Sequence, residues 1–349
     1  MRRTANIIGW DNGGGLSRDI QLIQQELTAL GWTVSLNSNR PRTISRTLFS
    51  RAMSRARRRI RATASAAGVV RKPFDVNLHL EEINEEQLSL AGRNVLIPNQ
   101  EWFRESSRPF LPVIDEVWTK THLASQVFSN LGCTVRYLGW MGNDRRIEDM
   151  RGRNPFKALH IAGASLWKGT DAVLDVWCRH PSWPSLVVLR RTHGYDGQRL
   201  PWSARVPCAN IEIISEHLDD RALKVMQNEC ALHVCPSEAE GFGHVLLESM
   251  STGALTITTD APPMNEMITR ETGLLAAAER SEPMHLGMRY FVDHAALERA
   301  IETALSMSER ERKTLGAAAR SRFDSSNGAF RGRLREYMLS ARHRSRHRS

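Results

Sequence analysis

The segment 232–260 limits the possible folds more than any other part of the chain. It begins with Leu232 to Cys235, a short apolar run of strand length that stops at a proline. A helix is then expected from Gly241 to Ser251, ending at Gly253, where the left-handed cap suits glycine. A second β-rich run, Leu255 to Thr259, follows at once. This order predicts an open α/β sheet, which binds ligands at the carboxyl ends of its strands.

Two carboxylates, Glu240 and Glu248, flank the start of this helix with seven residues between them. A helix that begins near Gly243 puts His244 and Glu248 on one face. The amides around Gly243 form an anion site, and the glutamates accept hydrogen bonds from hydroxyls. A phosphate with a sugar on either side, as in a nucleotide-sugar, would satisfy both needs. An ordinary surface helix with two solvated glutamates is the alternative.

This segment also resembles a known family on the residues Pro236-Ser237, Glu240-Gly241-Phe242-Gly243 and Glu248. The pattern PSxxEGFGxxxxE is the signature of GT-B glycosyltransferases of the glycosyltransferase-4 (group 1) type. The resemblance implies an α/β fold with two Rossmann-like domains facing across a cleft and a C-terminal helix that crosses back to the N-terminal domain. It implies that Glu248 holds the donor ribose, that Glu240 meets the transferred sugar, and that Gly241, Phe242 and Gly243 contact the donor.

At 349 residues the chain has room for two domains. We expect an acceptor-binding domain over 1–150, a nucleotide-sugar-binding domain over 151–326, a crossover helix over 327–340 and a disordered basic tail over 341–349. Hydrophobic residues make up 41% and no apolar run approaches the ~20 residues that span a bilayer. The first ten residues lack the apolar core of a signal peptide. We therefore expect a cytoplasmic protein, either free or peripheral at the inner face of the membrane.

The five cysteines are odd in number and share no CxxC spacing. Neither a disulfide framework nor a zinc site is therefore expected. Cys178, Cys230 and Cys235 lie in apolar surroundings, which predicts buried packing residues. The net charge of +10 favours polyanionic partners, namely phosphates, an anionic membrane surface or nucleic acid, without choosing among them.

The basic segment from Arg40 to Lys72 carries ten arginines and one lysine. Apolar residues recur in it every three to four positions, which predicts a basic amphipathic helix at about 43–66. Three interpretations stay open: a helix lying on anionic lipid, a phosphate or nucleic-acid contact, or a solvated helix without a partner. Lipid leads because enzymes of the resembling family often dock on membranes through basic surfaces, and nucleic acid is the least favoured partner.

Near the N-terminus, a buried-type strand from Ala5 to Trp10 runs into the glycine-rich turn Gly13-Gly14-Gly15, and a helix is expected from Leu16 to Leu30. Glycines at this place let a substrate approach the backbone, although a plain tight turn explains them as well. In the resembling family this loop faces the donor phosphates and the acceptor. The resemblance therefore places Gly13, Gly14 and Gly15 in the donor site.

Further candidates follow two strands of the first half. The strand Phe74 to Leu80 delivers His79 near its carboxyl end, where the resembling enzymes often keep a histidine beside the transferred sugar. A structural, hydrogen-bonded histidine is the alternative. Asn99, Glu101 and Trp102 follow another strand and suit acceptor recognition, because an aromatic face stacks on a pyranose while polar groups bind its hydroxyls. The two aromatics Trp102 and Phe103 would fit a core equally well.

In the second half, Lys168 stands just before the helix expected from Thr170 to Trp177. A lysine at a helix amino end is electrostatically misplaced unless it shares an anion, and its position resembles the family's diphosphate-binding lysine. Ser165 in the same loop is assigned to donor binding. Relatives commonly carry an arginine where this chain has Ala164, so Arg190 or Arg191 would have to substitute, or Lys168 acts with helix amides alone.

These observations predict a hexosyltransferase that moves a sugar from a nucleotide-sugar to a saccharide or lipid-linked acceptor. Glu240, Lys168 and His79 are the expected catalytic residues. The resemblance implies retention of configuration, and no metal site or cofactor is expected because the chain lacks an evident DxD motif. The alternatives are a GT-B epimerase acting on the donor sugar, a basic nucleic-acid-binding protein, and a non-catalytic family member.

Overall fold

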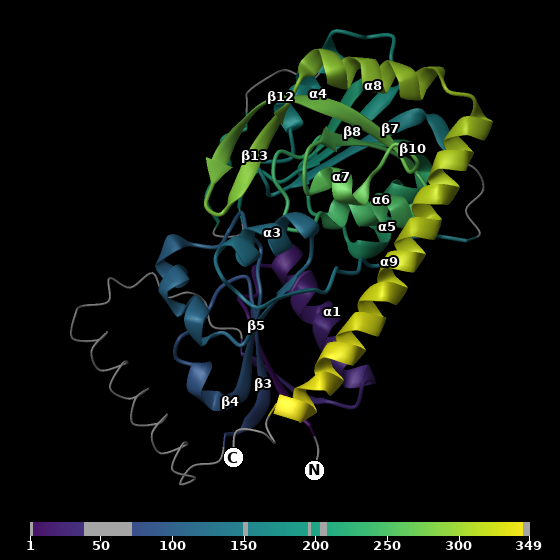
Figure 1. Cartoon of the computed structure of the whole chain (residues 1–349). Coiled ribbons are helices and arrows are strands. Elements are labelled where there is room, and N and C mark those ends of the chain that lie inside the picture. Colours follow the sequence, from purple (N-terminus) through teal and green to yellow (C-terminus); the bar gives the residue numbers. More distant parts are fainter. Residues whose placement is uncertain (1–2, 38–71, 149–152, 195–196, 203–207, 345–349) are drawn as a thin grey trace. The chain divides into compact units, whose positions relative to one another are not determined.

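The chain forms two compact units, each with its own sheet (Figure 1). The computed structural model describes residues 3–37, 72–148, 153–194, 197–202 and 208–344. Unit 1 comprises the described parts of 1–120, 124–138 and 331–349, and unit 2 those of 121–123 and 139–330. Residues 139–148, which end the expected first domain, therefore group with unit 2.

Unit 1 contains a six-stranded sheet in the order β2-β1-β3-β4-β5-β6, with every neighbouring pair parallel. Its central strand β3 is buried almost continuously, as expected for a parallel strand covered on both faces. Its elements are β1 (Thr4–Ile8), α1 (Gly15–Ala29), β2 (Thr33–Asn37), β3 (Phe74–Leu80), η1 (Leu88–Leu90), β4 (Ala91–Ile97), η2 (Glu105–Val113), β5 (Glu116–Thr119), α3 (His122–Asn130) and β6 (Val135–Tyr137).

Unit 2 contains a seven-stranded sheet in the order β13-β12-β11-β10-β7-β8-β9. All neighbours are parallel except β12 and β13, which form an antiparallel hairpin. Its elements are β7 (Asn154–Gly163), α4 (Thr170–Cys178), β8 (Ser185–Arg190), β9 (Ile211–Ile214), α5 (Asp220–Glu229), β10 (Cys230–Cys235), α6 (His244–Thr252), β11 (Leu255–Asp260), α7 (Met264–Met267), β12 (Leu274–Met284), β13 (Gly287–Val292) and α8 (His294–Ser306).

Helices cover both faces of the unit 2 sheet. Successive residues of a strand point to opposite faces, and Ala158 and Leu159 of β7 belong to different apolar clusters. The cluster of Ala158 includes residues of α4 and α8, and that of Leu159 includes residues of α5. Figure 1 shows α4 and α8 on one side of the sheet and α5 and α6 on the other. The loops that follow the parallel strands therefore emerge at one edge of the sheet, between the two helix layers.

The C-terminal helix differs from the prediction. A crossover helix was expected over 327–340, but α9 (Glu309–Arg344) is one helix of 36 residues that runs through the weak helix formers 325–328. Phe323 and Phe330, on either side of that stretch, are only 2% and 0% exposed, and such packing outweighs low propensity. Residues up to 330 group with unit 2 and residues from 331 with unit 1. The expected disordered tail is wrong for 341–344, which continue α9.

A disulfide bond joins Cys178 to Cys208, with 5.5 Å between their Cα atoms. Cys178 packs against the apolar core as expected, but the expectation that no disulfide forms is wrong. The reason is that the pairing depends on the fold, which brings the end of α4 close to Cys208 in the segment before β9. A separation of 30 residues has no recognisable spacing signature.

Some expectations fall on residues that the structure does not describe. The basic amphipathic helix at 43–66 and the tail residues 345–349 lie outside the described ranges. Among the helices of the described ranges, none is both long and apolar enough to cross a membrane.

Candidate functional site

The loop between β7 and α4 brings Lys168 into contact with Glu240 in unit 2. The Lys168 Nζ forms an ion pair with a carboxylate oxygen of Glu240, and the two side chains are 17% and 8% exposed. Two of the predicted catalytic residues, 72 positions apart, are therefore neighbours. The Glu240 carboxylate supplies the anion that a lysine near the start of a helix needs.

A close backbone approach holds the two loops together. Gly169 caps α4 with a φ of 68°. A Cβ at this position would lie 2.2 Å from the Pro236 carbonyl oxygen, so only glycine fits. The Glu238 N–H donates to the Trp167 carbonyl at 2.9 Å. The loop that carries Lys168 is thus pinned to the loop that carries Glu240.

The β12–β13 hairpin holds the Glu240 loop from its other side. The N–H of Tyr290 on β13 donates to the Glu238 carbonyl at 2.7 Å. Arg289 Nε donates to Glu238 Oε2 at 2.5 Å. Burial raises the pKa of the Glu238 carboxyl, and Arg289 opposes part of that rise. Arg289 and the hairpin were not predicted.

The helix that follows, α6, begins at His244, three residues after the expected start at Gly241. Gly243 is the N-cap of α6 with a φ of 90°, and Gly253 is its C-cap with a φ of 72°. Glu248 lies in the second turn, is 4% exposed, and accepts a hydrogen bond at 2.7 Å from Gln227 of α5. Gln227 was not predicted, because a single glutamine in a helix has no signature.

Lys168, Glu240 and Glu248 surround the carboxyl end of β10. All three exert an electrostatic effect on the thiol of Cys235, the last residue of that strand, whose pKa burial raises to about 12. The predicted donor residues Gly241, Phe242 and Gly243 occupy the loop between Cys235 and α6 and are all buried. One edge of the unit 2 sheet therefore carries a cation, two acidic side chains and a helix amino end.

The other predicted residues of unit 2 have local roles. The Ser165 hydroxyl accepts a hydrogen bond from the Trp167 N–H at 3.3 Å. Arg190 stacks over Trp202 with 5.5 Å between its guanidinium carbon and the ring centre. Arg191 contacts His217, with 3.0 Å between Nη2 and Nδ1.

His160 of β7 links β10 to the start of α4 by hydrogen bonds. Its Nδ1 lies 2.7 Å from the Val234 carbonyl and its Nε2 lies 2.9 Å from the Thr170 hydroxyl. Because a carbonyl only accepts, Nδ1 carries the proton and Nε2 accepts from Thr170. Burial lowers the pKa of His160 to about 4, so the ring is neutral near pH 7.

In unit 1, the backbone amides of the glycine-rich turn are hydrogen-bonded to polar side chains close by in the sequence. The Gly13 N–H is 2.7 Å from the Ser17 hydroxyl and 3.2 Å from an Asp11 carboxylate oxygen, and the Gly14 N–H donates to Asn12 at 2.8 Å. The Ser17 hydroxyl and the Gly13 amide lower the pKa of Asp11. Gly14 is the N-cap of α1 and Gly15 its first residue. A phosphate at Gly13 would therefore compete with the Asp11 carboxylate.

His79 is fully buried on β3, and its two ring nitrogens have different surroundings. The Asn84 N–H donates to Nδ1 at 3.2 Å, so a neutral ring carries its proton on Nε2. Among the described residues, Nε2 has no hydrogen-bond partner. Burial lowers the pKa of His79 to about 4, with a smaller opposing effect from Asn94. A buried donor without an acceptor is uncommon in a native protein.

A polar cluster that was not predicted lies beside Asn99 in unit 1. Asn99 accepts from the Lys120 Nζ at 2.9 Å and donates to Glu81 at 3.4 Å. Lys120 also forms an ion pair with Asp19, and these two side chains are 2% and 3% exposed. Glu81 has a φ of 67°, and burial raises its pKa to about 7. The sequence held a signal, because Asp19 falls on the apolar face of its helix between Leu16 and Ile23.

The residues that follow Asn99 separate into core and surface. Glu101 is 4% exposed, Trp102 is 42% exposed and Phe103 is fully buried. Phe103 packs edge-on against Phe128 with 5.4 Å between ring centres. The core interpretation therefore holds for Phe103, while Trp102 presents its ring to solvent.

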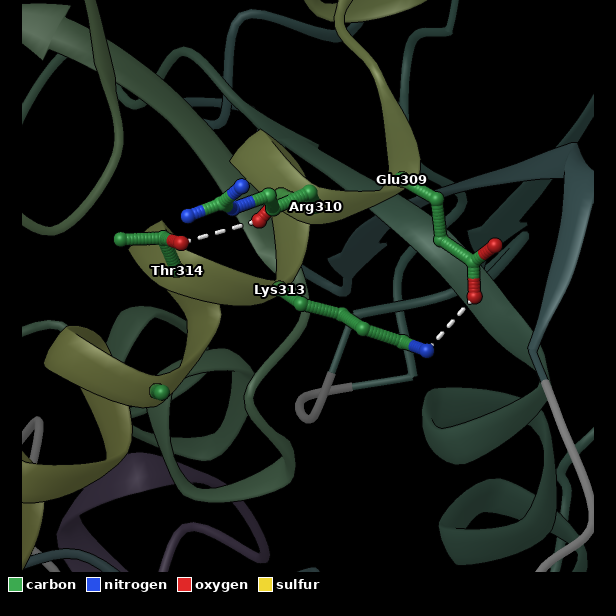
Figure 2. Close-up of a pocket in the computed structure, with 5 residues that line it drawn as sticks. Glu309, Arg310, Lys313 and Thr314 are labelled. Carbon is green, nitrogen blue, oxygen red and sulfur yellow. Dashed lines mark hydrogen bonds and ion pairs between the residues drawn. The ribbon is translucent and has the colours of Figure 1, made fainter.

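A surface pocket on the first turns of α9 is unrelated to these residues (Figure 2). Glu309 and Lys313 form an exposed ion pair of 2.6 Å there, and the Thr314 hydroxyl donates to the Arg310 carbonyl at 2.9 Å. Ala317 completes its lining. An exposed pair four residues apart is ordinary helix-surface chemistry.

Comparisons with known proteins agree with this geometry. Residues 209–322, which include Glu240 and Glu248, match the family model described as "Glycosyl transferases group 1". A lipopolysaccharide core biosynthesis mannosyltransferase, LpcC of Rhizobium leguminosarum bv. viciae, is 28% identical over 170 residues. The match covers 43% of this chain and 46% of that relative, so less than half of either protein is compared.

Solved structures match over nearly the whole chain. A glycosyltransferase from Rickettsia africae ESF-5 has a TM-score of 0.71 at 12% identity, covering 97% of this chain and 98% of its own. Alr3699/HepE of Anabaena, solved in complex with UDP and glucose, has a TM-score of 0.63 at 12% identity, covering 97% and 100%. This chain therefore has the GT-B fold of glycosyltransferases, and residues 209–322 of its second unit match the group 1 glycosyl transferase model.

Proposed function

We propose that this chain is a hexosyltransferase that moves a sugar from a nucleotide-sugar donor to a saccharide or lipid-linked acceptor, with retention of configuration and without a metal ion. The Lys168–Glu240 ion pair beside the start of α6 is the observation that carries the proposal. The family-model match, the mannosyltransferase relative and the structure solved with UDP and glucose support it. The name of that relative favours a lipid-linked acceptor.

The difficult part of such a transfer is the charge on the leaving group. As the bond between the anomeric carbon and the phosphate oxygen breaks, its electron pair stays on the nucleoside diphosphate. The acceptor oxygen then bonds to that carbon on the same face, and its proton passes to the phosphate. Lys168 and the amides at Gly241 to Gly243 would stabilise the growing negative charge. In this mechanism the diphosphate takes over the role of the Glu240 carboxylate, which frees Glu240 to meet the sugar.

Glu248 and unit 1 would supply recognition. A buried carboxylate such as Glu248 accepts hydrogen bonds from the two ribose hydroxyls. His79 would donate from Nε2 to the transferred sugar once that buried nitrogen becomes accessible to the donor. The exposed Trp102, with Asn99 and Glu101, would contact the acceptor. Peripheral attachment to the cytoplasmic face of a membrane through the basic segment stays a proposal, as does the role of the glycine-rich turn.

Thermal unfolding against UDP, GDP, ADP and their sugar conjugates would identify the donor, because saturation at ~100 times the dissociation constant adds about 2.7 kcal/mol of stability. We then expect Glu248→Ala to weaken nucleotide binding about 10- to 100-fold, since a hydrogen bond to a charged group contributes ~1.5 to 3 kcal/mol. Glu240→Gln should reduce turnover and leave nucleotide affinity nearly unchanged. Glu229→Gln, a half-exposed carboxylate of the same unit, is the control.

Unchanged nucleotide affinity in Glu248→Ala would overturn the ribose-binding role of Glu248.

The same protein preparations distinguish the alternative functions. An epimerase would convert the donor without an acceptor. The similar proteins from Rhizobium leguminosarum and Rickettsia africae are described as a mannosyltransferase and a glycosyltransferase, which favours transfer over epimerisation. A nucleic-acid-binding protein would show salt-dependent retention of DNA or RNA and no response to nucleotide-sugars.

A further inference from the structure

We propose that Gln227 is a positioning residue, which holds the Glu248 carboxylate in the orientation that a donor ribose requires, and that Arg145 holds Gln227 in turn. This inference rests on the proposed function, because it takes Glu248 as the ribose-binding residue. Neither Gln227 nor Arg145 belongs to the signature around Glu240, and both lie in unit 2.

The contacts of Gln227 leave its amide only one orientation. The side chain is fully buried on α5. Its Nε2 donates to Glu248 Oε2 at 2.7 Å, and its Oε1 accepts from Arg145 Nε at 2.8 Å. A guanidinium can only donate and a carboxylate can only accept. A flipped amide would face donor with donor and acceptor with acceptor, so the two neighbours fix which end meets Glu248.

Arg145 is itself clamped in place. Its Nη1 and Nη2 bind the Asp220 carboxylate and carbonyl at 2.6 and 2.9 Å. Its backbone N–H donates to the Ser251 hydroxyl at 2.9 Å, and that hydroxyl donates to the Glu248 carbonyl at 2.7 Å. Arg145 therefore supports Glu248 by two routes, through the Gln227 side chain and through the turn of α6 that carries it.

The chemistry of this arrangement suits a carboxylate that must bind hydroxyls. A guanidinium placed directly on Glu248 would occupy both carboxylate oxygens with charged donors. Here the neutral amide of Gln227 lies between the guanidinium and the carboxylate. Gln227 thus orients the carboxylate through one hydrogen bond at Oε2 and keeps the cation of Arg145 one residue away. Loss of the amide should impair ribose binding rather than the chemical step.

Calorimetry with UDP, GDP and ADP, each alone, tests this role in four proteins: wild type, Gln227→Met, Glu248→Gln and the double variant. We expect each single variant to weaken binding of the preferred nucleotide by ~10- to 100-fold, the range for a hydrogen bond to a charged group. The double variant should be little weaker than Glu248→Gln, because residues in one network act non-additively. In turnover assays Gln227→Met should raise KM and change kcat little. Asn210→Ala, which removes a partly buried amide elsewhere in unit 2, should bind like the wild type.

A second variant separates hydrogen bonding from packing. Gln227→Glu keeps the shape and the acceptor for Arg145 but places a carboxylate against Glu248. Repulsion should raise the pKa of that pair, so nucleotide affinity should recover as the pH falls from about 8 to about 6, unlike in the wild type. This variant carries the test if Gln227→Met does not fold.

The outcomes distinguish the two proposals. Equal binding by wild type and Glu248→Gln would overturn the ribose-binding role of Glu248, and with it this part of the proposed function. Weakened binding in Glu248→Gln together with normal binding in Gln227→Met would overturn only the positioning role. So would an equal loss from Gln227→Met in the wild-type and Glu248→Gln backgrounds, or a Gln227→Glu variant with no added dependence on pH.

Discussion

Replacement of Lys168 by methionine is the sharpest test of the proposed chemistry. Methionine keeps most of the apolar volume of the lysine stem and removes the charge. Loss of one group that stabilises developing negative charge typically costs about 2.7 to 4 kcal/mol of barrier. We therefore expect turnover to fall by roughly 100- to 1000-fold. Nucleotide affinity should fall less, because the charge on the diphosphate is greatest as the bond breaks.

The same variant should also be less stable. Removal of one partner from a fully buried ion pair costs ~3 to 5 kcal/mol, whereas exposed pairs contribute ~0 to 1 kcal/mol. Lys168 is 17% exposed and Glu240 is 8% exposed. This intermediate burial leads us to expect a loss of about 2 kcal/mol in urea unfolding, with turnover measured where the variant is still folded.

Lys157→Met is the matched control. Lys157 lies on β7, the strand that precedes the Lys168 loop. It pairs with Glu229 at 3.4 Å, and the two side chains are 24% and 41% exposed. It should cost less than about 1 kcal/mol and leave turnover within about twofold of the wild type. If folded Lys168→Met protein also retained turnover within a few-fold of the wild type, the proposed role of Lys168 would be refuted.

Three further variants test the structure around the site. Gly169→Ala should be much less stable in urea than Gly132→Ala, because both glycines have a positive φ but a Cβ at Gly132 meets nothing within 4 Å; equal losses would contradict the close approach to Pro236. His160 binds a proton in the unfolded chain but not in the native protein between about pH 4 and 6.5, so stability should rise with pH across that range by up to ~3 kcal/mol from this residue. His160→Gln should flatten the measured curve, and an unchanged slope would contradict the burial effect. Reduction of the Cys178–Cys208 disulfide should lower stability by about 3 to 4 kcal/mol for a loop of this length, and Cys178→Ala should abolish the response to reductant.

Much of the fold could be predicted because its signals are local. The strand Phe74–Leu80 was predicted with the bounds that the structure shows, since it is a short run of β-forming residues between polar or turn residues. The β12–β13 hairpin was missed. Its first strand, β12, is rich in alanine and charged residues and lacks an apolar alternation. The place of the hairpin also depends on contacts with distant residues such as Glu238. The continuity of α9 was missed for a related reason, because buried aromatics decide it rather than propensity.

The candidate site divides in the same way. Lys168, Glu240 and Glu248 could be selected from the resemblance and from helix geometry, and the structure brings them to one strand end. The Lys168–Glu240 contact itself depends on β7 and β10 being neighbours in the sheet, which no spacing states. Gln227 and Arg145 could not be selected, because a contact across 82 positions leaves no mark in the sequence.

The hairpin bears on attempts to exchange specificity between enzymes. Glu238 lies two positions before Glu240, the proposed sugar contact. It is hydrogen-bonded to Trp167 before α4 and to Arg289 and Tyr290 of β13. A chimera that transplanted only 236–248 would lose the hydrogen bonds to Arg289 and Tyr290. Such a transplant should therefore include 274–292 from the same parent enzyme.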